Sequence, residues 1–131
     1  MLKELAQYIE DETALVIGTD LFAGYIPEGS QEDCIVLIES GGDPNTSLSD
    51  AGAATIQILS RAKDYWTARD NAYLIYNFLH CAAGITLPVV TVGKEYYINT
   101  ISAIAFPQSV GQDDRGLFNV STNFILQKQD K

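Results

Sequence analysis

The sequence has very few of the residues that catalytic and metal sites use. His80 is the only histidine, and Cys34 and Cys81 are the only cysteines. His80 and Cys81 cannot face each other as a dyad, because adjacent helical positions point about 100° apart. No GxGxxG, Walker or GxSxG pattern is present. We therefore predict no catalytic residue, no cofactor and no metal site, and a protein that is not an enzyme.

Basic residues are also scarce. Eight Lys and Arg stand against 17 Asp and Glu, which gives a formal net charge of −9. Such a charge repels nucleic-acid phosphates and anionic membranes, and disfavours a DNA-binding role. No apolar run approaches the roughly 20 residues of a membrane span. The first 12 residues are typical of an acidic amphipathic helix and not of a signal peptide, so we expect synthesis in the cytoplasm with both thiols buried and reduced.

Apolar residues make up 47% of the 131 positions, which is typical of a globular chain. A chain of this length fits one domain, and we predict a single domain over residues 1–131. Helical spacing predicts helices over residues 2–12 and 65–81, the second with Asp64 as N-cap and Gly84 as a stop.

Strands are predicted over residues 21–26, 34–39, 54–63, 88–92, 95–106 and 117–128. The fourth and fifth form a hairpin that turns at Gly93 and Lys94. In the last strand the apolar residues alternate and share one face; they are Phe118, Val120, Phe124 and Leu126. The order α-β-β-β-α-β-β-β predicts an α+β fold, a mostly antiparallel sheet with two helices packed on one face.

Three aromatic residues have no evident role within the chain: Tyr25, Trp66 and Tyr73. Each alone is more often a core residue. Together with the polar, acidic loops they indicate a surface that a partner covers. The carboxylates of Asp113 and Asp114 lack the alternating spacing of a calcium loop, so they favour a solvated turn or an intersubunit contact.

Two longer stretches resemble a known family. They are IQILSRAKDYWTARDNAYLIYNFL at residues 56–79 and the loop FPQSVGQDDRG that begins at Phe106. Their order and spacing resemble the small minor capsid family of tailed bacteriophages, which is similar to the tail terminator (tail completion) proteins of long-tailed phages. The resemblance implies a tail-terminator-like α+β fold and a hexameric ring. This ring caps the finished tail tube, ends its polymerisation and presents a surface for head–tail joining.

The same resemblance implies the partners and the location. The partners would be further copies of the chain, the tail tube protein and a head–tail connector protein, with DNA only passing through the lumen and no membrane contact. The location would be the tail–head junction of the virion.

Candidate contacts lie in two polar loops that are long without a catalytic reason, residues 41–50 and 108–116. They are Asp43, Asn45, Asp50, Gln112, Asp113 and Asp114. Arg61, Arg69 and Arg115 are the candidate salt-bridge donors between subunits, because cations are scarce. For Arg61 and Arg69 the alternative is an ion pair within the chain, to Asp64 or Asp70.

Two other functions stay open. A head-completion or connector adaptor shares the small size and the ring-forming habit. A small non-enzymatic ligand-binding α+β domain would need a defined apolar pocket with converging polar groups.

Overall fold

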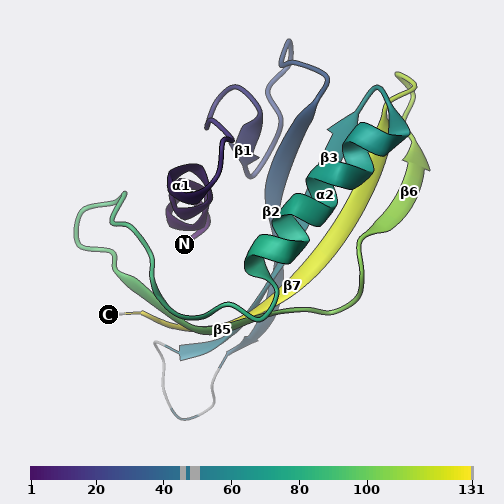
Figure 1. The fold of residues 1–131 in the computed structure, drawn as a ribbon. Helices are drawn as coiled ribbons and strands as arrows, with labels where there is room; N and C mark the ends of the chain where they lie inside the picture. The colour runs from purple at the N-terminus through teal and green to yellow at the C-terminus, as the bar shows by residue number, and fades with distance from the viewer. Residues whose placement is uncertain (45–46, 48–50, 131) are drawn as a thin grey trace.

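One sheet of seven strands curls around two helices (Figure 1). The computed structural model describes residues 1–44, 47 and 51–130. Along the chain the elements are α1 (Leu2–Glu12), β1 (Leu21–Ala23), β2 (Cys34–Pro44), β3 (Ala51–Ala62), α2 (Tyr65–Leu79), β4 (Ala83–Thr86), β5 (Tyr96–Ala103), β6 (Gln108–Gln112) and β7 (Phe118–Asp130). The predicted α+β class, with a mostly antiparallel sheet, is confirmed.

Strand β7 organises the sheet. The strand order is β1-β2-β3-β7-β5-β4, and β6 also pairs with β7. On one side β7 pairs with β3 along its whole length, from Ala51↔Gln129 to Ala62↔Phe118. On the other side it pairs first with β6 and then with β5. Among the named strands of the described residues, β1 and β2 are the only pair in parallel orientation.

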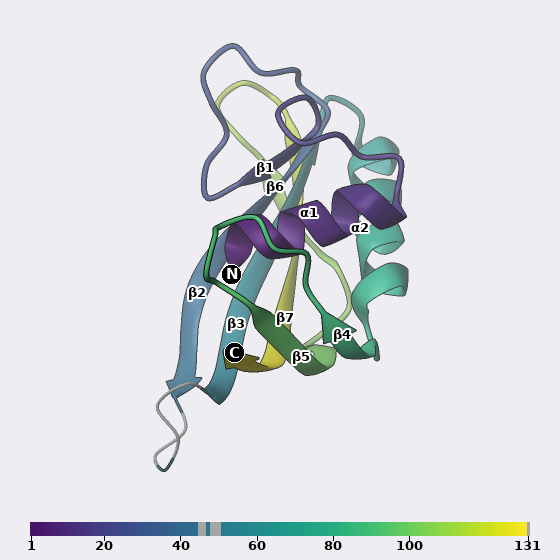
Figure 2. The same ribbon diagram turned by 90° about the vertical axis from the view of Figure 1, so that its left-hand side faces the viewer.

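The main core lies between the sheet and both helices. It combines Leu5 and Ile9 of α1, Ile75 and Leu79 of α2, and Phe124 of β7, all fully or almost fully buried. The ring of Phe78 stacks on that of Tyr8, with centroids 5.4 Å apart, and so links the helices. This arrangement confirms that both helices pack on one face of the sheet (Figure 2).

The start of α2 is fixed as the sequence predicts. The Asp64 carboxylate accepts a hydrogen bond from the Thr67 backbone N–H at 3.1 Å, as an N-cap does. The buried Ser60 hydroxyl donates to the Ala68 carbonyl at 2.8 Å and ties the helix to β3. The helix ends at Leu79, two residues earlier than predicted, because Cys81 has a positive φ of 67° and its N–H bonds to Ile101 of β5.

Four sequence predictions about strands and loops are wrong. Residues 88–92 form no strand; β4 lies earlier, at Ala83–Thr86, and includes the predicted helix stop, Gly84. Ile85 of β4 pairs with Ile98 of β5, so the hairpin exists with a different first strand and a longer loop. The predicted loop 108–116 contains the extra strand β6, and the predicted loop 41–50 is partly taken up by β2, which extends to Pro44.

The two cysteines differ in environment. Cys34 is buried on the face of β2 opposite the main core, where it packs with Phe22 and Val36. Burial raises the pKa of its thiol. Cys81 is exposed, so the expectation that both are buried is correct only for Cys34. Both cysteines are free thiols.

Candidate assembly surfaces

A ladder of side chains runs along one flank of α2. Its members are Trp66, Arg69, Tyr73, Tyr76 and Phe106, and we call it the aromatic ladder. The Arg69 guanidinium carbon lies 4.5 Å from the Tyr73 ring centroid and 5.9 Å from that of Trp66. Ring centroids are 5.9 Å apart for Tyr73 and Tyr76, and 5.6 Å apart for Tyr76 and Phe106.

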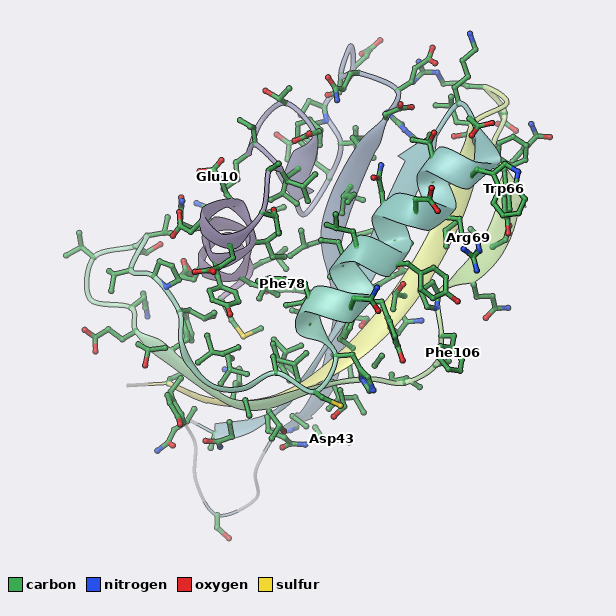
Figure 3. The ribbon with its side chains drawn as sticks, in the orientation of Figure 1. Glu10, Asp43, Trp66, Arg69, Phe78 and Phe106 are labelled. Carbon is green, nitrogen blue, oxygen red and sulfur yellow. The ribbon has the colours of Figure 1, made fainter. Side chains whose placement is uncertain are left out.

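Helical spacing explains why these residues meet. Positions 66, 69, 73 and 76 follow steps of three and four, which place side chains on one side of a helix. Phe106 joins from the segment between β5 and β6. Figure 3 shows Trp66, Arg69 and Phe106 on the same side of the molecule. Trp66 is 63% exposed and Phe106 is 70% exposed, so both present large apolar surfaces to solvent.

The ladder is separate from the side of α2 that packs on the sheet. That side is made of Ala68, Ala72, Ile75 and Leu79, all buried. Alanine at two of these positions lets the helix lie close to β3 and β7, and the larger aromatic residues remain outside. Exposed Trp and Tyr beside Arg are typical of the residues that dominate protein interfaces.

His80 extends the ladder at the end of α2. Its ring stacks on Tyr76 with centroids 5.0 Å apart, and its Nδ1 accepts a hydrogen bond from the Ala103 N–H at 3.0 Å. The histidine therefore joins the helix end to β5. These contacts give it a structural role.

A second apolar surface lies between α1, β1 and the loop that joins β4 to β5. Figure 1 shows these three segments on the side of the fold away from α2. It is a groove with a volume of about 370 Å³. Its lining residues are Lys3, Ala6, Gln7, Ile17, Gly18, Leu21, Phe22, Ala23, Tyr25, Pro27 and Val90. We call it the α1–β1 groove. Tyr25 is 71% exposed at its edge.

Two carboxylates of α1 lie beside this groove. The amide nitrogen of Gln7 donates to Glu10 at 3.1 Å and to Asp11 at 2.9 Å. Glu10 also accepts a hydrogen bond from the backbone N–H of Ile17 at 2.7 Å. Because Gln7 and Ile17 both line the groove, these two carboxylates lie at its rim, and Lys3 lines the groove as well. Figure 3 labels Glu10 on α1.

The contact residues predicted from sequence fall into separate regions. Gln112 to Arg115 lie at the turn between β6 and β7, next to the end of β3 where Ala62 pairs with Phe118. Asp43 lies at the other end of the same sheet (Figure 3). The structure therefore does not bring the two loops together. Asn45 and Asp50 lie outside the described residues.

The predicted arginines have different surroundings. The Arg61 guanidinium donates to the backbone carbonyls of Gln31 and Glu32, at 3.3 and 3.4 Å. Arg69 stacks on aromatic rings. Neither forms an ion pair with Asp64 or Asp70 in the part of the chain that the structure describes, so that alternative is wrong. Arg115 is exposed, and its predicted role between subunits stays a prediction.

The comparison with known families decides what kind of protein carries these surfaces. The sequence matches the family described as "Bacteriophage tail terminator protein" over residues 8–130, which is nearly the whole chain. The chain belongs to the bacteriophage tail terminator family. A tail terminator is a structural phage protein and a virion component, and the resemblance drawn from the sequence is confirmed. A search of curated proteins finds no match.

Among the residues that the structure describes, no group of three or more His, Cys, Asp or Glu side chains is arranged to hold a metal ion. No helix in the described ranges is long and apolar enough to cross a bilayer.

Sequence reasoning found only part of the terminator's two surfaces. It identified Tyr25, Trp66 and Tyr73 as residues for a partner to cover, and the structure leaves all three exposed or partly exposed. It missed Tyr76 and Phe106. The regular spacing of Trp66, Arg69, Tyr73 and Tyr76 was the available signal for one of them. No local pattern predicts that Phe106 reaches the same helix.

At the β6–β7 turn of the terminator, acid is expected to loosen the structure through Asp113. Its Oδ1 accepts hydrogen bonds from the N–H groups of Leu117 (3.0 Å) and Arg115 (2.9 Å), and these bonds lower its pKa below the usual 3.8. A lowered pKa means that the contribution to stability is complete above pH 3.8 and is lost as the pH falls through the folded-state value. In an NMR pH titration, the amide chemical shifts of Leu117 and Arg115 should change together, at a pH below 3.8.

The matched variant for this prediction is Asp113→Asn. Its amide oxygen can still accept these bonds but carries no charge, so the acid-induced shift should disappear while the turn persists at pH 7. An unchanged titration in Asp113→Asn would contradict the assignment to this carboxylate.

Proposed function

We propose that the chain is a tail terminator subunit that caps the completed tail tube, ends its polymerisation and provides the surface for head–tail joining, as a hexameric ring. Its partners are then further copies of itself, the tail tube protein and a head–tail connector protein. It acts in the virion, at the tail–head junction, after synthesis in the host cytoplasm, and it catalyses no reaction. The observation that carries the proposal is the family match over residues 8–130.

The two apolar surfaces support a ring. A ring with one subunit type needs two different, complementary patches on each copy. The aromatic ladder and the α1–β1 groove are different in chemistry and lie on opposite sides of the fold. Each surface exposes large aromatic side chains, Trp66 and Phe106 on the ladder and Tyr25 at the groove, and such residues favour burial by a partner.

The charge supports passage of DNA without binding. With a net charge of −9, the subunit has few cations that could neutralise phosphates. The salt-dependent attraction that holds DNA on a protein grows with the number of phosphates neutralised. A lumen formed by such subunits would let DNA move through and not grip it.

The test combines the purified chain with tail tube protein. Native mass spectrometry should give the mass of six subunits, either free or bound to tubes. Adding the chain to polymerising tube protein should shorten the tubes and place density at one tube end in electron micrographs. Tubes of unchanged length, together with binding of the chain to portal-type rings, would favour the connector adaptor and contradict this proposal.

Arg115→Glu is expected to weaken assembly and leave the subunit folded. Arg115 is exposed at the β6–β7 turn, and among the described residues its side chain forms no ion pair. A reversed charge at the rim of an interface acts mainly on association rate and salt dependence, here by about 10-fold. Lys63→Glu, another exposed cation, is the control. Equal assembly of Arg115→Glu and wild type would remove this loop from the interface.

A further inference from the structure

We propose that neighbouring subunits join by the aromatic ladder of one copy packing on the α1–β1 groove of the next copy. This inference rests on the proposed function, because it assigns the contact that would close the ring. It commits each surface to one occupant, a second copy of this chain.

The ladder supplies the chemistry of an interface centre. Trp66 and Phe106 offer exposed rings at its two ends, and Arg69 lies between them with its guanidinium over Tyr73. The stacked guanidinium still has N–H groups free to bind a carboxylate of another subunit. The ladder is thus an aromatic surface with one central cation.

The α1–β1 groove is complementary to the ladder in shape and charge. Its walls are apolar, from Ala6, Phe22 and Val90, and can receive aromatic rings. Glu10 and Asp11 lie beside it, held by Gln7, and Lys3 lines it, so two carboxylates and one ammonium leave this side of the groove with a net negative charge. Aromatic rings opposite an apolar groove, with a guanidinium opposite carboxylates, satisfy both kinds of group at once.

A ladder-to-ladder contact is disfavoured. It would be isologous and would offer Arg69 no carboxylate partner, because the ladder of the other copy carries none. It would also leave both grooves in water. The ladder-to-groove contact covers both surfaces and can repeat around a ring.

The test uses one disabled surface per variant. Trp66→Asp disables the ladder, and Tyr25→Asp disables the groove; both residues are exposed, so each variant should fold. Each alone should associate at least roughly 30-fold more weakly than wild type, as for loss of an interface hot spot. Mixed at equal amounts, they should form dimers with one copy of each and no ring, because one intact ladder then meets one intact groove. Native mass spectrometry with one variant isotope-labelled reads this out.

Two matched controls introduce the same aspartate at exposed positions outside the ladder and the groove. Leu74→Asp alters an exposed leucine on another flank of α2, and Val92→Asp alters a side chain that is 95% exposed and does not line the groove. Both should assemble as wild type does. Circular dichroism confirms that all four variants are folded.

Several outcomes would overturn the proposal. If Trp66→Asp assembles as wild type does, the ladder is not part of the contact between subunits. If Tyr25→Asp assembles as wild type does, the groove is not part of that contact and has another occupant, such as the tail tube protein. Dimers of Tyr25→Asp alone indicate a ladder-to-ladder contact, and a mixture that stays monomeric excludes the pairing.

These experiments distinguish failure of the proposed contact from failure of the proposed function. If wild-type rings form and the mixed variants pair, but tubes are not capped, the contact holds and the function fails. If Trp66→Asp and Tyr25→Asp cap tubes as wild type does, the function holds and the contact fails. Should wild type close its ring only on tubes, the same variants are scored by their retention at tube ends.

Discussion

Replacing Phe124 with alanine is expected to lower the free energy of unfolding by about 3–5 kcal/mol. Phe124 is fully buried in the middle of β7, where it pairs with Ile56 of β3 and Ala103 of β5. Its ring belongs to the core cluster that also holds residues of α1 and α2, so truncation leaves a cavity that reaches all layers of the fold. Urea unfolding followed by circular dichroism measures the loss.

The neighbouring residue provides the control. Ile125 points to the other face of β7 and is only partly buried, so Ile125→Ala should cost no more than about 1.5 kcal/mol. Equal losses for the two variants would show that the helices do not cover the face that carries Phe124.

Gly42→Ala is expected to separate the end of the β2–β3 hairpin and to destabilise the subunit by roughly 3 kcal/mol or more. The residue has φ of +126°, a conformation that side chains rarely adopt. A Cβ there would lie 2.0 Å from the carbonyl oxygen of Ala53, in the partner strand. The pairs Gly42↔Ala54 and Pro44↔Gly52 should therefore open, which hydrogen exchange of the β3 amides can detect.

Gly41→Ala separates conformational strain from this clash. Gly41 also has a positive φ, +93°, but a Cβ there meets nothing within 4 Å. It should cost only the left-handed penalty, about 1–2 kcal/mol. Similar losses for both variants would mean that the close approach to Ala53 does not constrain the hairpin.

The parts of the fold that were predictable are those with a strong local pattern. The helix Leu2–Glu12 shows helical spacing of its apolar residues, and Asp64 is a side chain suited to an N-cap. The expectation that the charged residues of this helix all face outward is wrong for Glu4, which is buried and pairs with the Met1 amine at 3.0 Å. The continuous apolar run at the start of β2 predicts a central strand, and β2 lies between β1 and β3. In the structure Ile35 joins the main core, and Cys34 and Val36 form a second cluster with Phe22.

The parts that were missed depend on tertiary contacts. Residues 88–92 have the β-branched composition of a strand, yet Val89 and Val90 lie in an exposed loop. The adjoining strand is formed instead by Ala83–Thr86, because Ile85 can pair with Ile98 there. Strand β6 is exposed throughout and has little strand propensity; it exists because β7 offers it a free edge.

The candidate surfaces were predictable to a similar extent. A second set of large residues on α2 showed that one sheet could not cover them all. The groove, in contrast, joins residues from α1, β1 and the β4–β5 loop, which are far apart in sequence, so Ile17 and Val90 gave no signal of a shared site. Asp113, one of the predicted loop residues, accepts hydrogen bonds within its own turn, and its contact with another subunit stays a prediction.

The position of β7 in the sheet has a consequence for biosynthesis. The ribosome makes this strand after β3, β5 and β6, yet all three need it as their hydrogen-bonding neighbour. A nascent chain that stops before Phe118 exposes unpaired edges on several strands, which are templates for aggregation. The subunit can therefore complete its sheet only after β7 has been translated.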